Sequence, residues 1–422
     1  MKLAVRPSSI EGTIPSSPSK SYTHRAMVLA LLADGRSTLK NTLLSGDTLA
    51  TLRAIQQLGA DVSVKGDVCT VQGGELTCPE DLIDAENSGT TIRLIAGIVS
   101  LLPCTTVLTG DESIRQRPMQ PLIDAFMELG VQCASLEGNG KAPLVVRGPN
   151  EGKITHIRGD VSSQFISSLL ISSPVKEVDT DVVLTTPLKS RPYIDITMEM
   201  MKRFGAECEE HGDSFHIQGG QFYDPAEYAI PGDYSSAAFP LVAGALAGRA
   251  SVSGLDPNDK QGDKRVVEVM RDFGARIDTT GGKLMVSAER LKARDVDLAD
   301  SPDLFPIVCV LATQAKGRTR IYNAEHVRLK ESDRIRSTTD FLRMMGAEVE
   351  ETKDGCVVEG PCKLKGAEVD SLGDHRILMA AAIAALVAEG ETVISDGGCY
   401  KISYPSFVQD MRALGADMEM IK

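Results

Sequence analysis

One short pattern returns six times along this chain and limits its fold more than any other feature. Each copy has an apolar residue, a glycine, usually an alanine, one polar residue and another apolar residue. Self-similarity at a nearly constant spacing predicts a chain built from six copies of one structural unit. The glycines are separated by 71, 75, 69, 72 and 69 residues and are Gly59, Gly130, Gly205, Gly274, Gly346 and Gly415.

Each of these glycines is expected to end an amphipathic helix. The apolar residues of 266–273 recur at helical spacing with charged residues between them. Gly274 then suits the left-handed position that closes a helix, because it has no Cβ to clash. Two short alternating stretches, such as 62–65 and 68–71, follow around a turn. Part of each unit is therefore predicted to be helix, strand, turn and strand.

A second helix, apolar on nearly every side, is predicted in each unit. A helix of this kind belongs inside a core. Membrane-spanning helices are the alternative, but they need about 18 or more uninterrupted apolar residues, and these runs are shorter and bounded by charge. We therefore expect no membrane association. The six predicted helices cover 21–33, 90–102, 163–171, 235–247, 302–315 and 375–388.

The six units fit two domains of three units each, because 422 residues exceed one domain of typical size, about 150 residues. The sixth unit ends one strand after Gly415, and residues 2–5 alternate as a strand does, so the N-terminus is expected to supply its missing strand. We predict a first domain over 14–229 and a discontinuous second domain over 1–13 and 230–422, with the active site in the cleft between them. Two crossings between domains form a hinge suited to closure on substrates.

Composition excludes several classes of function. The net charge is −13, tryptophan is absent and aromatic residues make up 4%, which disfavours nucleic-acid binding. The nine cysteines contain no C-x-x-C pair, so neither a zinc site nor a redox motif is indicated, and reduced cytoplasmic thiols are expected. No phosphate-binding loop motif or dinucleotide fingerprint occurs. We expect no metal, no cofactor and a monomeric protein.

Polar residues at the starts of the six buried helices predict an anion site. A helix N-terminus offers unpaired N–H groups and a partial positive charge. Ordinary N-capping, worth about 1 kcal/mol for each helix, is sufficient to explain Ser235 and Asp233. It does not explain Lys20, Arg25 and Arg376, because cations in a first turn oppose the helix dipole. The pattern therefore predicts a cleft for a substrate with phosphate and carboxylate groups.

Seven short motifs occur in order along the chain, at 18–21 with Arg25, 87–90, 117–118, 161–165, 190–195, 330–334 and 374–376. Together they resemble the motifs of the EPSP synthases, a family of enolpyruvyl transferases. The resemblance implies an α/β fold: a two-domain inside-out α/β barrel with three βαβαββ repeats in each domain. It also implies transfer of the enolpyruvyl group of phosphoenolpyruvate to the 5-hydroxyl of shikimate 3-phosphate. Phosphate is released, and no metal or organic cofactor takes part.

The resemblance also assigns site residues. Asp303 is the expected base for the 5-hydroxyl, with a helix N-cap as its structural alternative. Glu331 is the expected proton donor to C3, with Lys20 as a competing candidate. Shikimate 3-phosphate would be bound by Lys20, Ser21, Arg25, Ser162, Ser163, Gln164, Ser190, Tyr193, Asp303 and Lys330. Phosphoenolpyruvate would be bound by Lys20, Asn87, Gly89, Arg117, Gln164, Arg334, Arg376 and Lys401.

Two alternatives stay open at this point. Enzymes that transfer enolpyruvyl to UDP-N-acetylglucosamine share the fold and the donor, but they usually carry a cysteine at the position of Glu112. A non-catalytic anion-binding scaffold, or the related RNA-phosphate cyclase fold, belongs to another class. This second class is disfavoured by the acidic net charge and by the presence of Asp303 and Glu331 beside cations.

Near the C-terminus, Ile402 stands where the family often has lysine, and Lys401 lies one residue earlier.

Overall fold

The chain forms two compact units in a computed structural model that describes residues 1–288 and 290–422. Unit 1 contains Met1–Ser17 and Pro231–Lys422, and unit 2 contains Pro18–Ile230. The first crossing thus lies four residues after the expected boundary at 13–14. The reason is that strand β2 (Ile10–Pro15) pairs in parallel with β15 (Gly248–Ser253) along its whole length, which keeps it in unit 1.

Each unit contains three repeats with the order strand, buried helix, strand, amphipathic helix and two further strands. In unit 2 the elements are α1 (Lys20–Leu32), β3 (Gly35–Lys40), α2 (Gly46–Gln57), β4 (Asp61–Lys65), β5 (Val68–Gly73), β6 (Ile83–Asp84), α3 (Gly89–Val99), β7 (Thr106–Thr109), η1 (Ile114–Gln116), α4 (Gln120–Glu128), β8 (Gln132–Ser135), β9 (Leu144–Arg147), β10 (Ile154–Ile157), α5 (Ser163–Ser172), β11 (Thr180–Leu184), α6 (Pro192–Arg203), β12 (Glu209–His211), β13 (Ser214–Ile217) and β14 (Glu227–Ala229).

Unit 1 repeats this order. Its remaining elements are β1 (Lys2–Arg6), α7 (Tyr234–Ala247), η2 (Gly262–Lys264), α8 (Arg265–Asp272), β16 (Arg276–Asp278), η3 (Thr280–Gly282), β17 (Lys283–Ser287), β18 (Val296–Asp297), η4 (Pro302–Leu304), α9 (Phe305–Thr313), β19 (Gly317–Tyr322), η5 (Glu325–Leu329), α10 (Arg334–Met344), β20 (Glu348–Thr352), β21 (Gly355–Gly360), β22 (Glu368–Val369), α11 (His375–Ala385), β23 (Thr392–Ile394), η6 (Cys399–Ile402), α12 (Phe407–Ala413) and β24 (Asp417–Ile421).

Six four-stranded sheets follow one plan. In each sheet, one parallel pair is extended by two antiparallel pairings, as in β6-β7-β9-β8. In four sheets the two parallel strands are consecutive, and the buried helix supplies the crossover connection between them. The parallel pairs β14-β3 and β2-β15 instead join strands that are far apart in the sequence. The other sheets have the orders β14-β3-β5-β4, β10-β11-β13-β12, β16-β17-β15-β2, β18-β19-β21-β20 and β22-β23-β1-β24.

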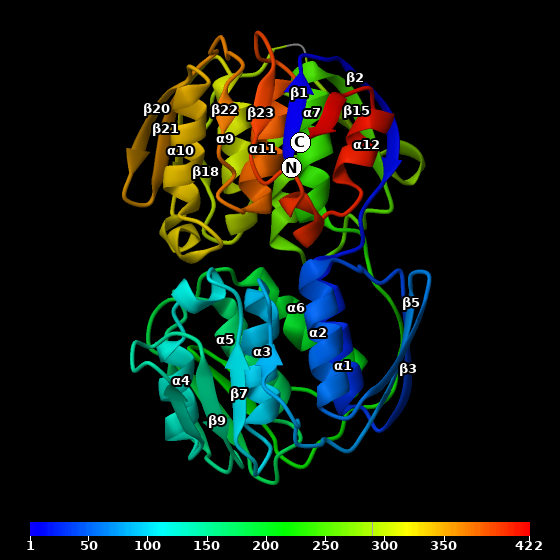
Figure 1. The fold of residues 1–422 in the computed structure, drawn as a ribbon, viewed down its shortest axis with the longest axis vertical. Coiled ribbons are helices and arrows are strands. Elements are labelled where there is room, and N and C mark those ends of the chain that lie inside the picture. The colour runs from blue at the N-terminus through cyan, green and yellow to red at the C-terminus, as the bar shows by residue number, and fades with distance from the viewer. Residues whose placement is uncertain (289) are drawn as a thin grey trace. The chain divides into compact units, whose positions relative to one another are not determined.

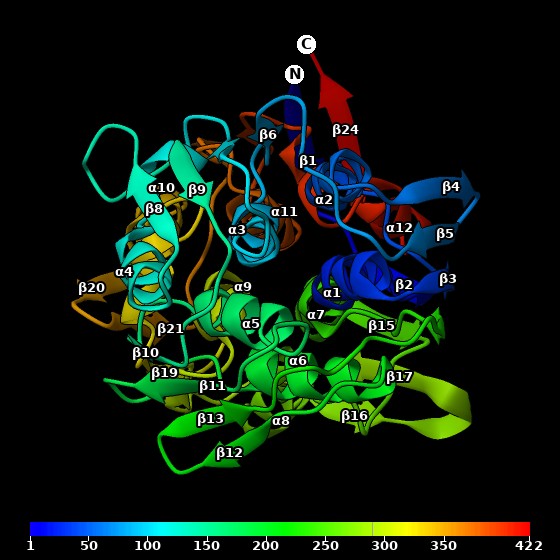
Figure 2. The same cartoon turned by 90° about the horizontal axis from the view of Figure 1, so that it is seen from below.

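The N-terminal strand completes the sixth sheet, as the sequence predicted. Strand β1 lies between β23 and β24 and pairs antiparallel with both, with Leu3 opposite Ile394 and Met420. Figure 2 shows β24 beside β1, with both chain ends close to them. The last repeat is therefore closed by the first residues of the chain.

The helices predicted to be apolar on all sides form the core of each unit. In unit 2 these are α1, α3 and α5, and in unit 1 they are α7, α9 and α11. Every residue of α11 is buried, and the residues that follow Arg376 in this helix carry no charge. Figure 1 shows that the sheets of each unit lie outside these helices, which is the inside-out arrangement expected from the resemblance. In the part of the chain that the structure describes, no helix is long and apolar enough to cross a membrane.

The six repeated glycines close the amphipathic helices, as predicted. Their φ angles lie between 82° and 108°, a region that glycine adopts without strain. In the first copy the N–H of Ala60 donates to the carbonyl of Ile55 at 3.0 Å, and the same bond recurs in each repeat. This is the hydrogen bond of a Schellman motif.

The expectation that all nine cysteines are reduced is wrong for one pair. Cys78 and Cys104 form a disulfide between the loop after β5 and the loop after α3. Tertiary folding brings together two cysteines that are 26 residues apart, a spacing that matches no recognisable motif. The other seven described cysteines are free thiols.

The central position of β1 in its sheet makes its apolar residues important for the stability of unit 1. Leu3 is fully buried, so Leu3→Ala is expected to lower the free energy of unfolding by about 2–5 kcal/mol through the cavity it leaves. Lys2→Ala, next to it on the exposed face of the strand, is the matched control and should change stability by less than about 0.5 kcal/mol. Urea unfolding measures both, and equal effects would contradict the central place of β1.

Candidate functional site

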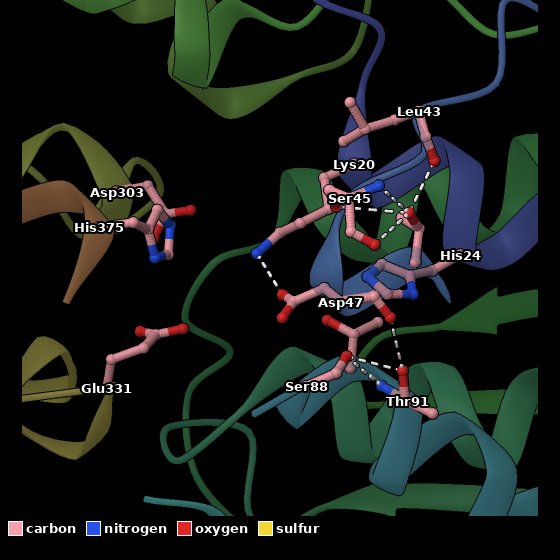
Figure 3. Close-up of polar contacts among 12 residues, drawn as sticks. Lys20, His24, Leu43, Ser45, Asp47, Ser88, Thr91, Asp303, Glu331 and His375 are labelled. Carbon is pink, nitrogen blue, oxygen red and sulfur yellow. Dashed lines mark hydrogen bonds and ion pairs between the residues drawn. The ribbon is translucent and has the colours of Figure 1, made fainter. Parts of the chain in front are cut away.

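In unit 2, the start of helix α1 carries a partly buried ion pair. The Lys20 ammonium donates to an Asp47 carboxylate oxygen at 2.7 Å, as Figure 3 shows. The side chains of Lys20 and Asp47 are 15% and 5% exposed. Asp47 lies in the first turn of α2, where a negative charge is favourable. The ion pair therefore joins the starts of two neighbouring helices.

A chain of buried hydroxyl groups lies beside this ion pair and joins α1, α2 and α3. The imidazole Nδ1 of His24 lies 2.7 Å from Thr51 Oγ1, which lies 2.6 Å from Thr91 Oγ1. Thr91 continues the chain to Ser88, the N-cap of α3, at 2.6 Å. Burial, followed by the charges of Lys20 and Arg25, holds the pKa of His24 well below its ordinary value, so this imidazole is neutral.

Arg25 is a buried cation held by neutral groups. Its guanidinium donates to the hydroxyls of Thr197 at 2.8 Å and Ser167 at 3.2 Å, and to the carbonyls of Ser21 and Tyr193 at 3.0 and 3.2 Å. Burial lowers the pKa of Arg25 to about 10. A bound anion at this guanidinium would relieve part of that desolvation, because it would supply the missing negative charge.

A second buried arginine of unit 2, Arg93, organises the starts of α3 and α5. Its guanidinium donates to Gln164 Oε1 at 2.6 Å and lies 5.0 Å from the centre of the Phe165 ring. The side-chain amide of Gln164 in turn donates to Thr90 at 2.7 Å. Ser162, the N-cap of α5, accepts the backbone N–H of Gln164 at 3.3 Å.

Gly89 leaves room for the guanidinium of Arg117. A Cβ at residue 89 would lie 2.6 Å from Arg117 Nη1, closer than any side chain tolerates without displacing that group. Arg117 is itself buried, and it donates to Ser113 at 3.3 Å. A glycine at the start of α3 thus lets a cation lie directly against the helix N-terminus.

The remaining predicted residues of unit 2 occupy the same helix starts. Ser163 begins α5 and is buried, while Tyr193 lies in the first turn of α6 and gives its carbonyl to Arg25. Ser190 is buried just before α6 with a φ of 55°, a strained value for a serine. Asn87 precedes α3 and donates to Asp111.

In unit 1, one buried guanidinium gathers three carboxylates. Arg334, at the start of α10, is 1% exposed and donates to Asp303 at 2.8 Å, to Glu331 at 2.6 Å and to Asp374 at 2.8 Å. Burial lowers its pKa, but the carboxylates of Asp374, Glu331 and Asp303 together raise it well above the ordinary value. We call Asp303, Glu331, Arg334, Asp374 and Arg376 the arginine–carboxylate cluster.

Asp303 lies between the two arginines of this cluster. Its second oxygen accepts from Arg376 at 3.0 Å, and Arg376 also donates to the carbonyl of Ser235 at 3.0 Å. Burial would raise the pKa of Asp303, but the Arg376 and Arg334 guanidinium groups hold it well below its usual range. Asp303 is therefore an ionised carboxylate, fixed in position, in the short helix η4 before α9.

The structure places the other predicted residues of unit 1 around this cluster or apart from it. Lys330 is the C-cap of η5 and directly precedes Glu331. His375 is buried in the first turn of α11, with Nδ1 3.9 Å from Asp374. Lys401 lies exposed in η6, where its backbone N–H donates to the carbonyl of Gly398 at 3.2 Å.

Three residues of these clusters were given no site role from the sequence, although Asp374 lies in the motif at 374–376. Asp47 pairs with Lys20, Arg93 holds Gln164, and Asp374 holds Arg334. Arg93 had a usable signal, because it is a lone charge within an otherwise apolar helix. Asp47 and Asp374 look like ordinary N-terminal helix residues, and only tertiary contacts reveal their partners. Within residues 1–288 and 290–422, no group of three or more His, Cys, Asp and Glu side chains could hold a metal ion.

Comparisons with known proteins identify the family of the chain. Residues 5–411 match the family described as EPSP synthase (3-phosphoshikimate 1-carboxyvinyltransferase). The chain is 52% identical over 421 residues to the 3-phosphoshikimate 1-carboxyvinyltransferase of Methanocorpusculum labreanum, covering 99% of each chain. It is 45% identical to that of Methanocaldococcus jannaschii, covering 97% of each. A solved structure of EPSP synthase from Acinetobacter baumannii superposes with a TM-score of 0.83 at 26% identity, covering 100% of each chain.

The arginine–carboxylate cluster allows a test of its own strength. Asp374→Asn keeps the N-cap of α11 but removes one of three negative charges around a buried guanidinium, so it should lower the free energy of unfolding by about 3 kcal/mol. Asp333→Asn, the N-cap of α10 with a partly exposed partner in Arg328, is the matched control and should cost less than about 1 kcal/mol. Urea unfolding measures the free energy of unfolding of both variants. If Asp333→Asn lowers it as much as Asp374→Asn does, burial does not set the strength of this cluster.

Proposed function

We propose how the residues of this chain, which belongs to the EPSP synthase family, divide the steps of the family's reaction. The chain is a transferase of the shikimate pathway. It moves the enolpyruvyl group of phosphoenolpyruvate to the 5-hydroxyl of shikimate 3-phosphate and releases phosphate. Transfer to UDP-N-acetylglucosamine is not favoured, because the identity over the full length is to 3-phosphoshikimate 1-carboxyvinyltransferases.

The reaction sets three demands on the protein. Two substrates with several negative charges must be held side by side, the attacking hydroxyl must lose a proton, and C3 of phosphoenolpyruvate must gain one. The adduct must then release phosphate, whose negative charge needs stabilisation. Fixed cations, a fixed base and a proton donor therefore account for the chemistry that the protein supplies.

Unit 2 binds shikimate 3-phosphate in this proposal. Arg25 pairs with the ring carboxylate. This role is supported by its guanidinium, whose hydrogen-bond acceptors among the described residues are hydroxyl and carbonyl oxygens. The phosphate lies at the start of α5, where Ser162 and Ser163 offer hydroxyls at the positive end of the helix dipole. Ser21, Gln164, Ser190 and Tyr193 complete the contacts, and Lys330 of unit 1 adds a further cation.

The arginine–carboxylate cluster of unit 1 carries the proton transfers. Asp303 takes the proton of the 5-hydroxyl, and the observation that carries this role is a carboxylate fixed by two guanidinium groups. Glu331 delivers the proton to C3, with Lys20 as the alternative donor. Arg334 and Arg376, together with Lys20, Arg117, Gly89, Asn87 and Gln164, hold phosphoenolpyruvate, and Lys401 is an outer contact to the departing phosphate.

This division follows from the balance of charge. The cluster in unit 1 has three carboxylates against two guanidinium groups, so it does not bind an anion well by itself. Unit 2 supplies Arg25, Arg93 and Arg117 at helix starts that already favour anions. We propose that both sets of residues serve one pair of substrates, so that catalysis requires both units, as the predicted domains 14–229 and 1–13 with 230–422 imply.

We further propose that the protein works as a cytoplasmic monomer. Sedimentation at assay concentration tests the oligomeric state. The redox state of Cys78 and Cys104 in cells bears on the compartment, because disulfides are rare in the reducing cytosol.

The acceptor is tested by phosphate release from phosphoenolpyruvate. We expect release with shikimate 3-phosphate and none with UDP-N-acetylglucosamine, because the serines at the start of α5 suit a small phosphorylated acceptor. Coupled detection of phosphate measures both reactions under the same conditions. Release with the sugar nucleotide alone would overturn the assignment of the acceptor.

The role of Asp303 is tested by Asp303→Asn, which keeps the size of the side chain and an oxygen for the arginines. A base acts in the transition state, so kcat should fall by about 10²- to 10⁴-fold while the Kd for shikimate 3-phosphate changes little. Asp272→Asn, an exposed acid on α8, is the control for loss of one negative charge. Weaker binding with an unchanged kcat would assign Asp303 to substrate binding instead.

A further inference from the structure

A buried carboxyl group outside the residues named so far lies behind the arginine–carboxylate cluster. Asp263 belongs to the short helix η2 and is 2% exposed. Its backbone is held on two sides. Gln261 bonds to the N–H of Tyr234 at 2.9 Å and to the carbonyl of Gly232 at 2.8 Å, and Ser301 donates to the carbonyl of Gly262 at 2.8 Å. Residues 261–263 therefore join the start of α7 to the segment that carries Asp303.

The carboxyl of Asp263 is poorly stabilised where it lies. One oxygen accepts from the Ser235 hydroxyl, and the other is buried without a hydrogen-bond partner. An unpaired buried carboxylate oxygen is unfavourable, and a neutral amide could accept the same bond from Ser235 without burying a negative charge. Packing alone therefore does not explain why an acid stands at this position.

Four charged or polar groups face Asp263 from the elements around it. They are Asp303 from η4, Arg376 from α11, and Asp233 and Ser235 from the start of α7. Burial, together with the charge of Asp303, raises the pKa of Asp263 to about 7, and Arg376 opposes this rise. The charge of Asp303 therefore disfavours the ionised form of Asp263, and the two carboxyl groups interact across Arg376.

Hydrogen bonds link Asp263 to the proposed base in three steps. Asp263 accepts from Ser235, the Ser235 carbonyl accepts from Arg376, and Arg376 donates to Asp303. Two guanidinium groups make Asp303 a weak base, because they stabilise its ionised form. A negative charge at Asp263 offsets part of the attraction that Arg376 exerts on Asp303, and so it makes Asp303 a stronger base.

We propose that Asp263 is a positioning residue that fixes Arg376 through Ser235 and sets the basicity of Asp303. This rests on the proposed role of Asp303 as the base for the 5-hydroxyl. Asp263 touches neither substrate, so its removal acts on the rate and its pH dependence rather than on substrate affinity.

The test is Asp263→Asn in the full chain, which keeps an acceptor for Ser235 and removes the charge. We expect kcat to fall by roughly tenfold. The acid limb of the kcat/KM profile should move to lower pH, because the rate of the variant no longer depends on the ionisation of Asp263. The Kd of shikimate 3-phosphate should stay unchanged. Glu268→Gln, an exposed acid on α8, removes the same charge elsewhere and should leave the rate and the profile as they are.

A stability measurement separates this role from a purely structural one. The raised pKa of Asp263 means that the folded protein loses stability as the pH rises from about 4 to about 7, where the carboxyl ionises. Asp263→Asn removes that loss, so its Tm relative to the wild type should increase between pH 5 and pH 8. A variant that does not fold, or whose Tm falls equally at both values, would assign Asp263 to structure and overturn the proposal.

The two proposals fail in different ways. If Asp303→Asn keeps full activity, Asp303 is not the base and the premise falls. If Asp303→Asn is inactive while Asp263→Asn has the wild-type rate and pH profile, the base stands and the role of Asp263 is wrong. Ser235→Ala, which breaks the link but keeps the charge, should lower kcat without moving the acid limb to lower pH. A shift of that limb equal to the shift in Asp263→Asn would show that the charge has no role of its own.

Discussion

The structure depends on the burial of six helices that are apolar on all sides. A helix of this kind gains stability only when every face is covered, so each unit places three of them in its centre and surrounds them with sheets. In the buried helices that the structure describes, charged side chains then lie in the N-terminal halves, because a charge deeper in the core would be desolvated without a partner. The N-terminal ends, with unpaired N–H groups, are the places where a fold of this kind can hold anions.

The repeat made much of the fold predictable. Six glycines at a steady spacing gave the number of units, the ends of the amphipathic helices and the place of β1 in the last sheet, because these follow from local periodicity and strand count. The domain crossing at 17–18 was not predictable, since it depends on how far β2 stays paired with β15. The Cys78–Cys104 disulfide was missed for the same reason, because it is a tertiary contact.

Residue types at the site were more predictable than their partners. Cations at helix starts stand out in a sequence, because they oppose the helix dipole. The acids that hold them do not, since Asp47 and Asp374 are also favourable where helices begin. Arg334 illustrates the gap: the motif predicts a cation for phosphoenolpyruvate, whereas the structure shows the same guanidinium held by three carboxylates. The binding role proposed for Arg334 is therefore inseparable from its hydrogen bond to Asp303.

The same guanidinium groups that fix Asp303 also weaken it as a base. A carboxylate between Arg334 and Arg376 is held in one orientation, which favours proton transfer through geometry, but its low pKa reduces the driving force for taking a proton. Binding of an anionic substrate would draw part of the guanidinium charge away and so raise the basicity of Asp303. A second acid behind Arg376 acts in the same direction before any substrate arrives. The two guanidinium groups thus fix the orientation of Asp303 and lower its basicity, and in our proposal the buried Asp263 raises the basicity without loosening the orientation.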